Sequence, residues 1–235
     1  LLSNCKRFVL EDCGLSSDVL VKLREDYRDR TKVVWRVYFG NGTSLTDAEV
    51  VRSVYDLKDS NCSELQYLED VKYADFGHDE YLNDSSFLSG MKSLEVLIIS
   101  GSPIKDLSPL SECKNLRILE IANCGYITDL SPLEDCESLE MLNISHTKAT
   151  EGLSALEERN ITHLTAVGGI WNKISQEDRD AFQEDHPDCW ILTSGNEYGV
   201  GWRYEDKETK MEWYEKASEA FKYPHAPNNV GWYLE

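Results

Sequence analysis

Apolar residues recur along the middle of the chain at a nearly constant spacing. Three segments have the form LxxLxL and begin at Leu94, Leu116 and Leu139, and a fourth, altered copy begins at Ile161. The starting positions are therefore separated by 22, 23 and 22 residues. Alternation with a period of two residues places flanking apolar side chains on one face of an extended chain. Each copy therefore predicts one short strand.

The stretch DLSPL follows two of these strands, at residues 106–110 and 129–133. Aspartate and serine are preferred at helix N-termini, and proline suits the first helical position because its missing amide hydrogen would be unpaired there. We therefore expect a short helical turn after each strand. A period of 22–23 residues with this pattern is typical of leucine-rich repeats, which stack because one repeat cannot bury its own apolar side.

The predicted fold class is an α/β leucine-rich-repeat solenoid, with parallel strands on the concave face, short helices or turns on the convex face, and helical caps. We expect this solenoid to span residues 1–193, with regular repeats at about 71–174 and longer helical units at 15–35 and 174–192. The strand-like stretch at 34–39 is interpreted as a weaker copy of the repeat. Between residues 46 and 67 the pattern departs from the repeat, and Ala48, Val51 and Tyr55 indicate a helix.

The composition changes after Thr193, where a stretch rich in glycine and charge precedes the helical pattern MEWYEKASEAF. In that pattern Trp213, Ala217 and Phe221 lie on one face of the predicted helix. We expect residues 194–235 to form a C-terminal capping segment over the open end of the solenoid, because solenoid ends need a cover.

The outward positions of successive strands should line the concave face. The candidate binding residues are Tyr38, Tyr73, Val96, Ile98, Ile118, Glu120, Met141, Asn143 and His163. Adjacent parallel strands lie ~4.8 Å apart, so the apolar members would form one patch. An exposed apolar patch indicates an interaction surface, which we expect to contact the ligand. The alternative is that another segment of the same chain covers this strip.

The charge of the chain restricts the possible partners. The formal net charge is −19 and the pI is about 4.6. This argues against nucleic acid, which is bound by clustered lysine and arginine, and favours a neutral or basic partner. No apolar run approaches the ~18 residues needed to cross a bilayer, so we expect no membrane insertion.

The seven cysteines show neither a disulfide framework nor a metal site, because their number is odd and no CxxC pair occurs. Cys113 and Cys136 occupy equivalent repeat positions, where small buried thiols and a disulfide or redox pair are the two interpretations. Cys189 lies three residues after His186, so a cysteine nucleophile is a further alternative there. No metal or cofactor is predicted.

The segment ITDLSPLEDCESLEMLNIS at 127–145 resembles the internalin-type bacterial leucine-rich repeat. The longer helical units and the tail containing GWR resemble leucine-rich-repeat proteins of gut Firmicutes. The resemblance covers residues 71–193 well and the first 60 residues loosely, and Cys113 and Cys136 stand where the family has leucine. It implies a protein partner bound through the concave face, at an extracellular or bacterial cell-surface location.

The sequence thus predicts a non-catalytic scaffold for protein recognition. Two alternatives remain open. One is a structural spacer in a larger surface protein, and the other is the targeting part of an enzyme whose catalytic domain is not in this chain.

Overall fold

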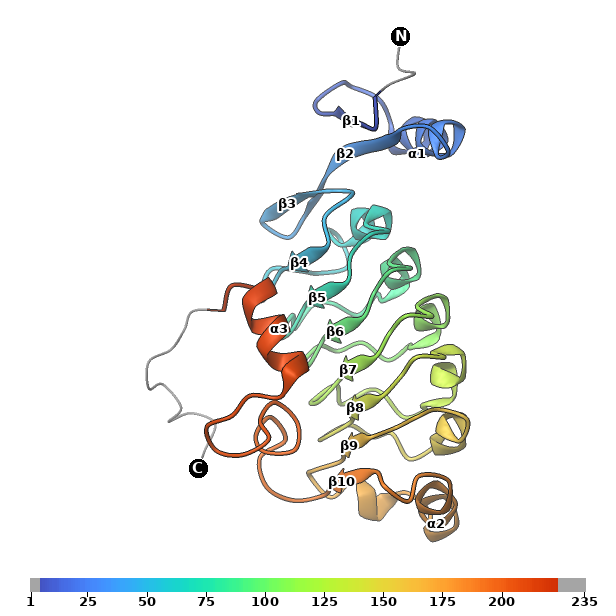
Figure 1. The fold of residues 1–235 in the computed structure, drawn as a ribbon, viewed down its shortest axis with the longest axis vertical. Helices are drawn as coiled ribbons and strands as arrows, with labels where there is room; N and C mark the ends of the chain where they lie inside the picture. The colour runs from blue at the N-terminus through green and yellow to red at the C-terminus, as the bar shows by residue number, and fades with distance from the viewer. Residues whose placement is uncertain (1–4, 224–235) are drawn as a thin grey trace.

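Parallel strands stacked in chain order dominate the structure, a computed structural model that describes residues 5–223 (Figure 1). The main sheet of the described chain has seven strands, in the order β10 to β4. They are β4 (Val50–Arg52), β5 (Tyr73–Asp75), β6 (Val96–Ile98), β7 (Ile118–Glu120), β8 (Met141–Asn143), β9 (His163–Thr165) and β10 (Trp190–Leu192). Equivalent repeat positions pair across it, as Val96 does with Ile118 and Ile118 with Met141. The predicted leucine-rich-repeat solenoid is confirmed.

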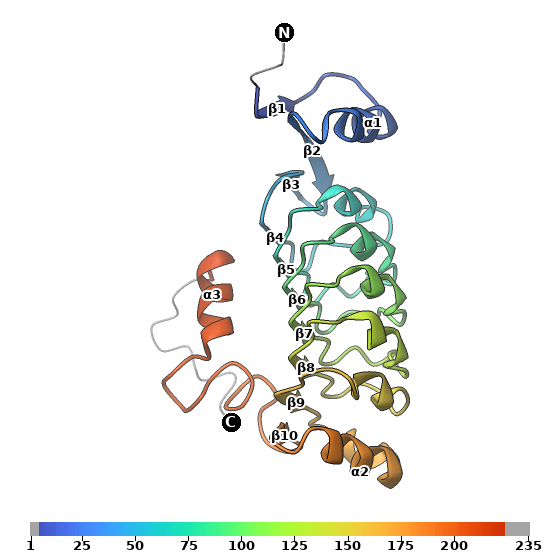
Figure 2. The same cartoon turned by 45° about the vertical axis from the view of Figure 1, so that its right-hand side comes forward.

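Short helices form the opposite, convex side of the stack (Figure 2). They are the 3-10 helices η1 (Ser63–Tyr67), η2 (Ser86–Gly90), η3 (Ser108–Glu112), η4 (Ser131–Asp135), η5 (Leu153–Leu156) and η6 (Trp171–Lys173), followed by α2 (Gln176–Asp185). Each DLSPL stretch forms such a turn: the carboxylate of Asp106 accepts the backbone N–H of Ser108 at 2.9 Å, and that of Asp129 accepts the backbone N–H of Ser131 at 2.8 Å. The recurring motif is therefore a capped turn on the convex side.

The inward positions of the strands form one continuous core between the sheet and these helices. Leu97, Leu119 and Leu142 are fully buried and pair in register across neighbouring strands. The stack thus buries what no single repeat could bury.

The N-terminal part differs from the expected repeat. It contains β1 (Arg7–Leu10), α1 (Ser17–Tyr27), β2 (Lys32–Phe39) and β3 (Gly42–Leu45). β2 pairs in parallel with β1 and antiparallel with β3, so these strands form a separate three-stranded sheet. The interpretation of residues 34–39 as a copy of the main repeat was wrong, because the turn at Gly40 folds the chain back and β3 takes the edge of β2.

The helix predicted between residues 46 and 67 was also wrong. Val50–Arg52 is β4 of the main sheet, and Val51 pairs with Ala74 of β5. Val51 is buried at the inward position that Leu97 occupies in β6. Val51 thus occupies a strand position. The apolar pattern around it is too short to distinguish a strand from a helix.

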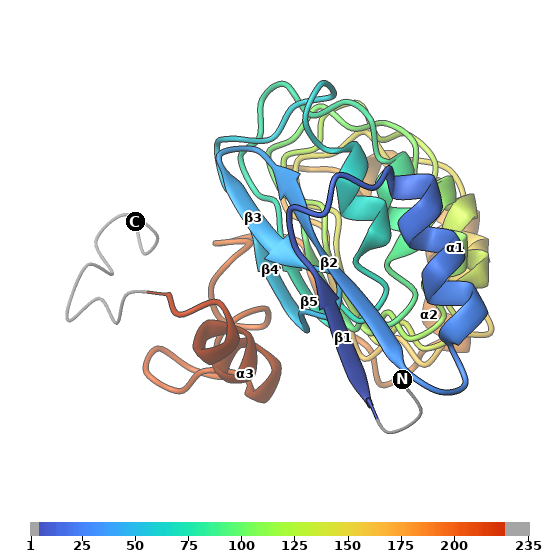
Figure 3. The ribbon, with the colours of Figure 1, turned by 90° about the horizontal axis from the view of Figure 1, so that it is seen from above.

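Residues 194–223, which we call the strap, cross the concave face. The segment 194–235 was expected to cap the open end of the solenoid, and its residues 224–235 lie outside the described residues. The strap contains α3 (Glu212–Ala220), which lies on the side of the sheet opposite to α1 and α2 (Figure 3). Within residues 5–223, no helix combines the length and apolarity that a membrane crossing requires.

Candidate functional site

The strap covers the apolar strip of the concave face. Trp202 is fully buried against Val96, Ile118 and Met141. A second cluster joins Ile98 to Ala217 and Phe221 of the strap. Contact thus extends over β6, β7 and β8, in the middle of the sheet.

The expected exposed patch is therefore corrected. The exposed fractions of Val96, Ile98, Ile118 and Met141 are 5%, 3%, 2% and 5%. The alternative, that the same chain covers the strip, describes the structure. The physical reason is that removing one such side chain from water stabilises the fold by about 1.5–3 kcal/mol. Burial of four adjacent apolar side chains under the apolar stripe of the tail is therefore strongly favourable.

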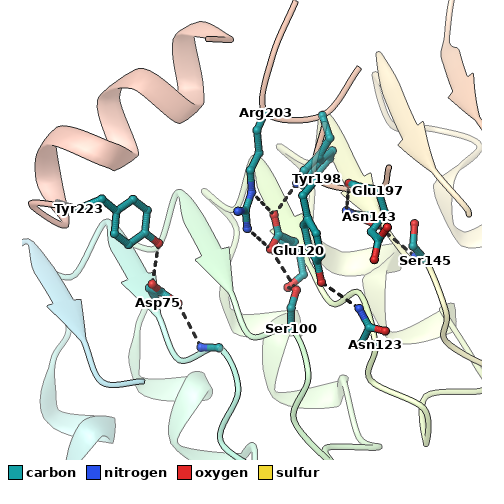
Figure 4. A network of polar contacts seen from close by, with 12 residues as sticks. Asp75, Ser100, Glu120, Asn123, Asn143, Ser145, Glu197, Tyr198, Arg203 and Tyr223 are labelled. Carbon is teal, nitrogen blue, oxygen red and sulfur yellow. Dashed lines mark hydrogen bonds and ion pairs between the residues drawn. The ribbon is translucent and has the colours of Figure 1, made fainter. Parts of the chain in front are cut away.

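Glu120 is the polar centre of this contact (Figure 4). Its side chain is fully buried, and Arg203 donates to Oε1 at 2.7 Å and to Oε2 at 3.2 Å. Trp202 Nε1 donates to Oε2 at 2.5 Å, and Ser100 Oγ donates to Oε1 at 3.1 Å. Both carboxylate oxygens are therefore satisfied, as a buried charge requires.

Arg203 is held by aromatic rings as well as by the carboxylate. Its guanidinium carbon lies 4.7 Å from the ring centre of Tyr198 and 5.1 Å from that of Tyr214, within the range of cation–π contacts. Burial acts to lower the pKa of Arg203, but the Glu120 carboxylate outweighs burial and the pKa is raised. The guanidinium therefore stays charged at every physiological pH.

Three further hydrogen bonds attach the strap to strands and strand ends. Tyr223 donates to Asp75 at 2.6 Å. Asn143 Nδ2 donates to the backbone oxygen of Glu197 at 2.9 Å, and Asn123 Nδ2 donates to the hydroxyl of Tyr198 at 2.9 Å. Asn143 was predicted as a binding residue, and in the structure its partner belongs to the same chain.

The other predicted residues lie outside the buried centre. Tyr38 belongs to β2 in the separate N-terminal sheet and is 52% exposed. Tyr73 is half-buried, and its ring packs edge-on against that of Phe221 with 6.4 Å between the ring centres. His163 is half-buried beside Trp190, and burial lowers its pKa. The structure therefore brings together the middle of the predicted set and separates Tyr38 from it.

An open cleft remains between the strap and the N-terminal half of the concave face. Its volume is about 340 Å³, and its lining includes Arg52, Tyr55 and His78 of the solenoid together with Tyr214 of the strap. Tyr55 is 74% exposed, and its ring stacks on that of His78 at 5.4 Å. We call this feature the concave cleft.

Tyr55 and His78 belong to a column of residues along one border of the sheet. Each is the third residue after its strand and has a positive φ, as do the equivalent residues Gly101, Asn123, His146 and Gly168. Asparagine and glycine tolerate this left-handed backbone, whereas tyrosine and histidine at such positions are less common. The repeat therefore presents side chains at regular intervals on this border.

His186 and Cys189, the possible base and nucleophile, both lie within residues 5–223, the described part of the chain. No cluster of three or more histidine, cysteine or acidic side chains there could hold a metal ion. The two ring nitrogens of His186 contact the backbone oxygens of Phe182 and Arg159, at 3.0 and 2.9 Å. Burial raises the pKa of Cys189 to about 11, so its reactive thiolate form is scarce at neutral pH.

The repeat cysteines occupy core positions. Cys113 and Cys136 are buried, and each thiol donates to a backbone oxygen, that of Leu88 or Leu110, at 3.4 Å. Burial raises the pKa of Cys113 to about 12 and that of Cys136 to about 11. This supports the interpretation of the two residues as packed thiols.

Sequence reasoning missed Trp202, Arg203 and Tyr198 as partners of the concave face. A signal for them was present, since the chain contains one strip of apolar outward positions and one amphipathic tail of similar length. The tail packs its apolar side chains on this strip, whereas the end of the stack was the partner expected for them. The sequence did not indicate that Glu120 is the partner of Arg203, because the chain has 43 acidic residues.

Comparison with known proteins agrees with this architecture. The family model described as "Leucine Rich repeats (2 copies)" matches residues 92–135. No curated protein has a significantly similar sequence. Among solved structures, an internalin (InlF) from Listeria monocytogenes strain 4b F2365 is similar with a TM-score of 0.53 and 23% identity, over 63% of this chain and 41% of that one.

Two further structures have lower TM-scores. Internalin C2 of the same Listeria strain has a TM-score of 0.48 and 26% identity, over 57% of this chain and 55% of that one. A leucine-rich-repeat protein from Leptospira interrogans has a TM-score of 0.43 and 15% identity, over 83% of this chain and 50% of that one. The chain thus spans between 41% and 55% of these proteins' lengths. The chain therefore has the leucine-rich-repeat fold, which the internalin InlF shares.

Proposed function

We propose that the chain is a non-catalytic protein-recognition scaffold that contacts its partner at the concave cleft. The observation that carries the proposal is the gathering of exposed Arg52, Tyr55 and His78 beside the strap, in an open cleft on a rigid sheet. Leucine-rich-repeat solenoids use their concave surfaces for binding. Tyrosine and arginine are the residue types most often responsible for binding energy in protein interfaces.

Rigidity and charge support the same proposal. The parallel strands hold the cleft in place before a partner arrives, which limits the ordering cost of binding. The net charge of −19 favours a basic or neutral protein over an acidic one and repels nucleic acid. As part of this proposal we place the protein outside the cell or on a bacterial cell surface, the location implied by the resemblance of its repeats to internalin-type repeats.

The test replaces the two stacked rings of the cleft. Tyr55→Asn with His78→Asn removes both rings and introduces the residue type that already occupies the equivalent left-handed position at Asn123. Proteins captured by the native chain from bacterial and host surface extracts are purified and titrated against native and variant chains. We expect the double variant to lose at least tenfold in affinity with an unchanged circular dichroism spectrum.

The matched control lies on the convex side, where Glu134→Lys with Glu137→Lys alters two exposed residues at η4. This control should retain full affinity. Equal affinity of the Asn variant and the native chain, or equal loss in both variants, would contradict recognition at the cleft.

A further inference from the structure

We propose that Glu120 is a recognition site for a guanidinium group beside an indole. Trp202 and Arg203 of the strap occupy this site as an internal ligand. A protein partner displaces the strap by presenting an aromatic residue next to an arginine. This proposal rests on the proposed function, because it names the partner chemistry of the same concave face. It goes further in treating the strap as exchangeable.

The solenoid alone builds the receiving half of this site. Glu120 projects from β7, and its two oxygens match the paired N–H groups of a planar guanidinium, which donate at 2.7 and 3.2 Å. Ser100, also on the solenoid, holds Oε1 at 3.1 Å. Val96, Ile118 and Met141 provide an apolar floor for the indole. The same site can therefore accept these two groups from another chain.

The strap is attached in a way that permits exchange. Among the described residues, no backbone–backbone hydrogen bond joins residues 196–223 to the sheet, and the backbone bonds of this segment are made within it. The strands pair with one another in an unbroken series without the strap. Displacement therefore breaks side-chain contacts and leaves the solenoid's own hydrogen bonding intact.

The exit of the strap and the open cleft give a route for exchange. Gly195, where the strap leaves the solenoid, has a φ of 103°, and a side chain placed there would meet no atom within 4 Å. Glu120 and Arg203 both line the concave cleft, and the Arg203 side chain is 19% exposed. The cleft thus borders the Arg203–Glu120 pair, and an incoming guanidinium reaches the buried carboxylate from the cleft as Arg203 leaves it.

The first test is chemical rescue of the full chain carrying Arg203→Ala. This variant leaves the buried Glu120 without its charged partner, so its melting temperature falls. Millimolar propylguanidinium, measured by thermal unfolding, should restore at least half of the lost melting temperature in a saturable manner. Propylammonium, with equal charge and a single donor centre, should restore much less, because it cannot form two parallel bonds.

The matched control is Arg117→Ala, which removes an exposed two-bond pair between Arg117 and Glu140 with distances of 3.1 and 2.6 Å. Neither compound should raise the melting temperature of this variant or of the native chain. If Arg203→Ala does not fold alone, it is refolded with each compound, and recovery of the native circular dichroism spectrum with propylguanidinium but not propylammonium becomes the measurement. The absence of a selective guanidinium response in the folded variant would overturn the proposal.

The second test measures exchange directly. A fluorescein-labelled peptide of residues 197–214 is titrated against the full chain carrying Trp202→Ala with Arg203→Ala, whose own strap lacks both anchors. We expect saturable binding, at least tenfold weaker binding of the peptide with Arg203→Ala, and at least tenfold weaker binding to the native chain, whose tethered strap competes at high effective concentration. Equal binding of both peptides, or no binding to the variant, would overturn the proposal.

The rescue and the peptide titration need no natural partner, whereas the test of the proposed function captures one. The captured partner then separates the two proposals. A partner that requires Tyr55 and His78 but is not displaced by the peptide leaves the proposed function standing and overturns the exchange of the strap. A partner that requires Tyr55 and His78, is displaced by the native peptide and is unaffected by the Arg203→Ala peptide supports both.

Discussion

At the scale of single residues, the described chain buries three acids, Asp75, Asp79 and Glu120, and the last two lie in different environments. Glu120 is fully buried and satisfied by Arg203, Trp202 and Ser100. Asp79 is 1% exposed, and its Oδ1 accepts the backbone N–H of Leu57 at 2.9 Å. Because burial is the largest influence on it, the pKa of Asp79 is raised to about 6. Asp79 is therefore the buried acid for which we predict a pH dependence.

Asp79→Asn is expected to stabilise the protein at neutral pH. The folded-state pKa of about 6 exceeds the ~3.9 of an unfolded aspartate, so the folded state binds this proton more tightly. Ionised Asp79 consequently lowers the free energy of unfolding above pH ~6, and this penalty disappears as the pH falls towards ~4. Urea unfolding should show a gain of about 1–3 kcal/mol for Asp79→Asn at pH ~7.5 and no gain at pH ~4.

The neighbouring exposed residue supplies the control for this prediction, since Glu80→Gln should change stability little at either pH. A gain of the same size at both pH values would mean that ionisation of Asp79 is not the cause. A loss at neutral pH would mean that its charge is stabilising.

At the scale of elements, the convex 3-10 helices begin in different ways. In η4 the Asp129 carboxylate accepts both the backbone N–H and the hydroxyl of Ser131, at 2.8 and 2.6 Å. These hydrogen bonds lower the pKa of Asp129. In η5 the corresponding start is Gly152, with a φ of 79°, so the stack tolerates more than one way of beginning the turn.

Asp129→Ala is expected to lower the free energy of unfolding by about 1 kcal/mol, because the first amide of η4 loses its acceptor. Glu134→Ala in the same element serves as the comparison, since Glu134 is exposed and its removal leaves the cap in place. Denaturant unfolding of the two variants side by side measures the difference. Indistinguishable midpoints would show that the cap contributes nothing measurable.

At the scale of the whole molecule, the strap joins strands that are far apart in sequence. Trp202 and Glu120 are separated by 82 residues, and Tyr223 and Asp75 by 148. Gly201 shows how closely the strap follows the end of the sheet, because an added Cβ there would lie 2.7 Å from the Trp190 ring. The strap is therefore part of the folded core as well as the candidate internal ligand.

Truncation after Ser194 is expected to destabilise the protein strongly. It exposes Val96, Ile98, Ile118 and Met141 together, and each large apolar side chain is worth about 1.5–3 kcal/mol against a typical total stability of about 5–15 kcal/mol. Thermal unfolding should show a clearly lower melting temperature or aggregation. Glu212→Ala, which removes only the exposed pair with Lys216, should melt like the native chain, and a truncated chain that does so as well would contradict the role of the strap in the core.

The sequence alone determined the repeat, because the same spacing of leucines must produce the same strand and turn each time. Leu97, Leu119 and Leu142 could be assigned to the core from their positions within LxL, and the convex turns from DLSPL. The outward positions of the strands could be listed for the same reason. Local pattern suffices wherever a residue's environment is set by its own repeat and its neighbours.

Only the tertiary structure decided what covers the concave face and where the N-terminal strands pair. Amphipathicity showed that the tail needed an apolar surface, but two such surfaces existed, the strip and the end of the stack. The Glu120–Arg203 pair and the Trp202 pocket depend on distances between segments about eighty residues apart, and hydrophobic burial has no directional code in the sequence. The candidate site was therefore found in part from its strand residues, whereas its occupant became visible only when the chain was folded.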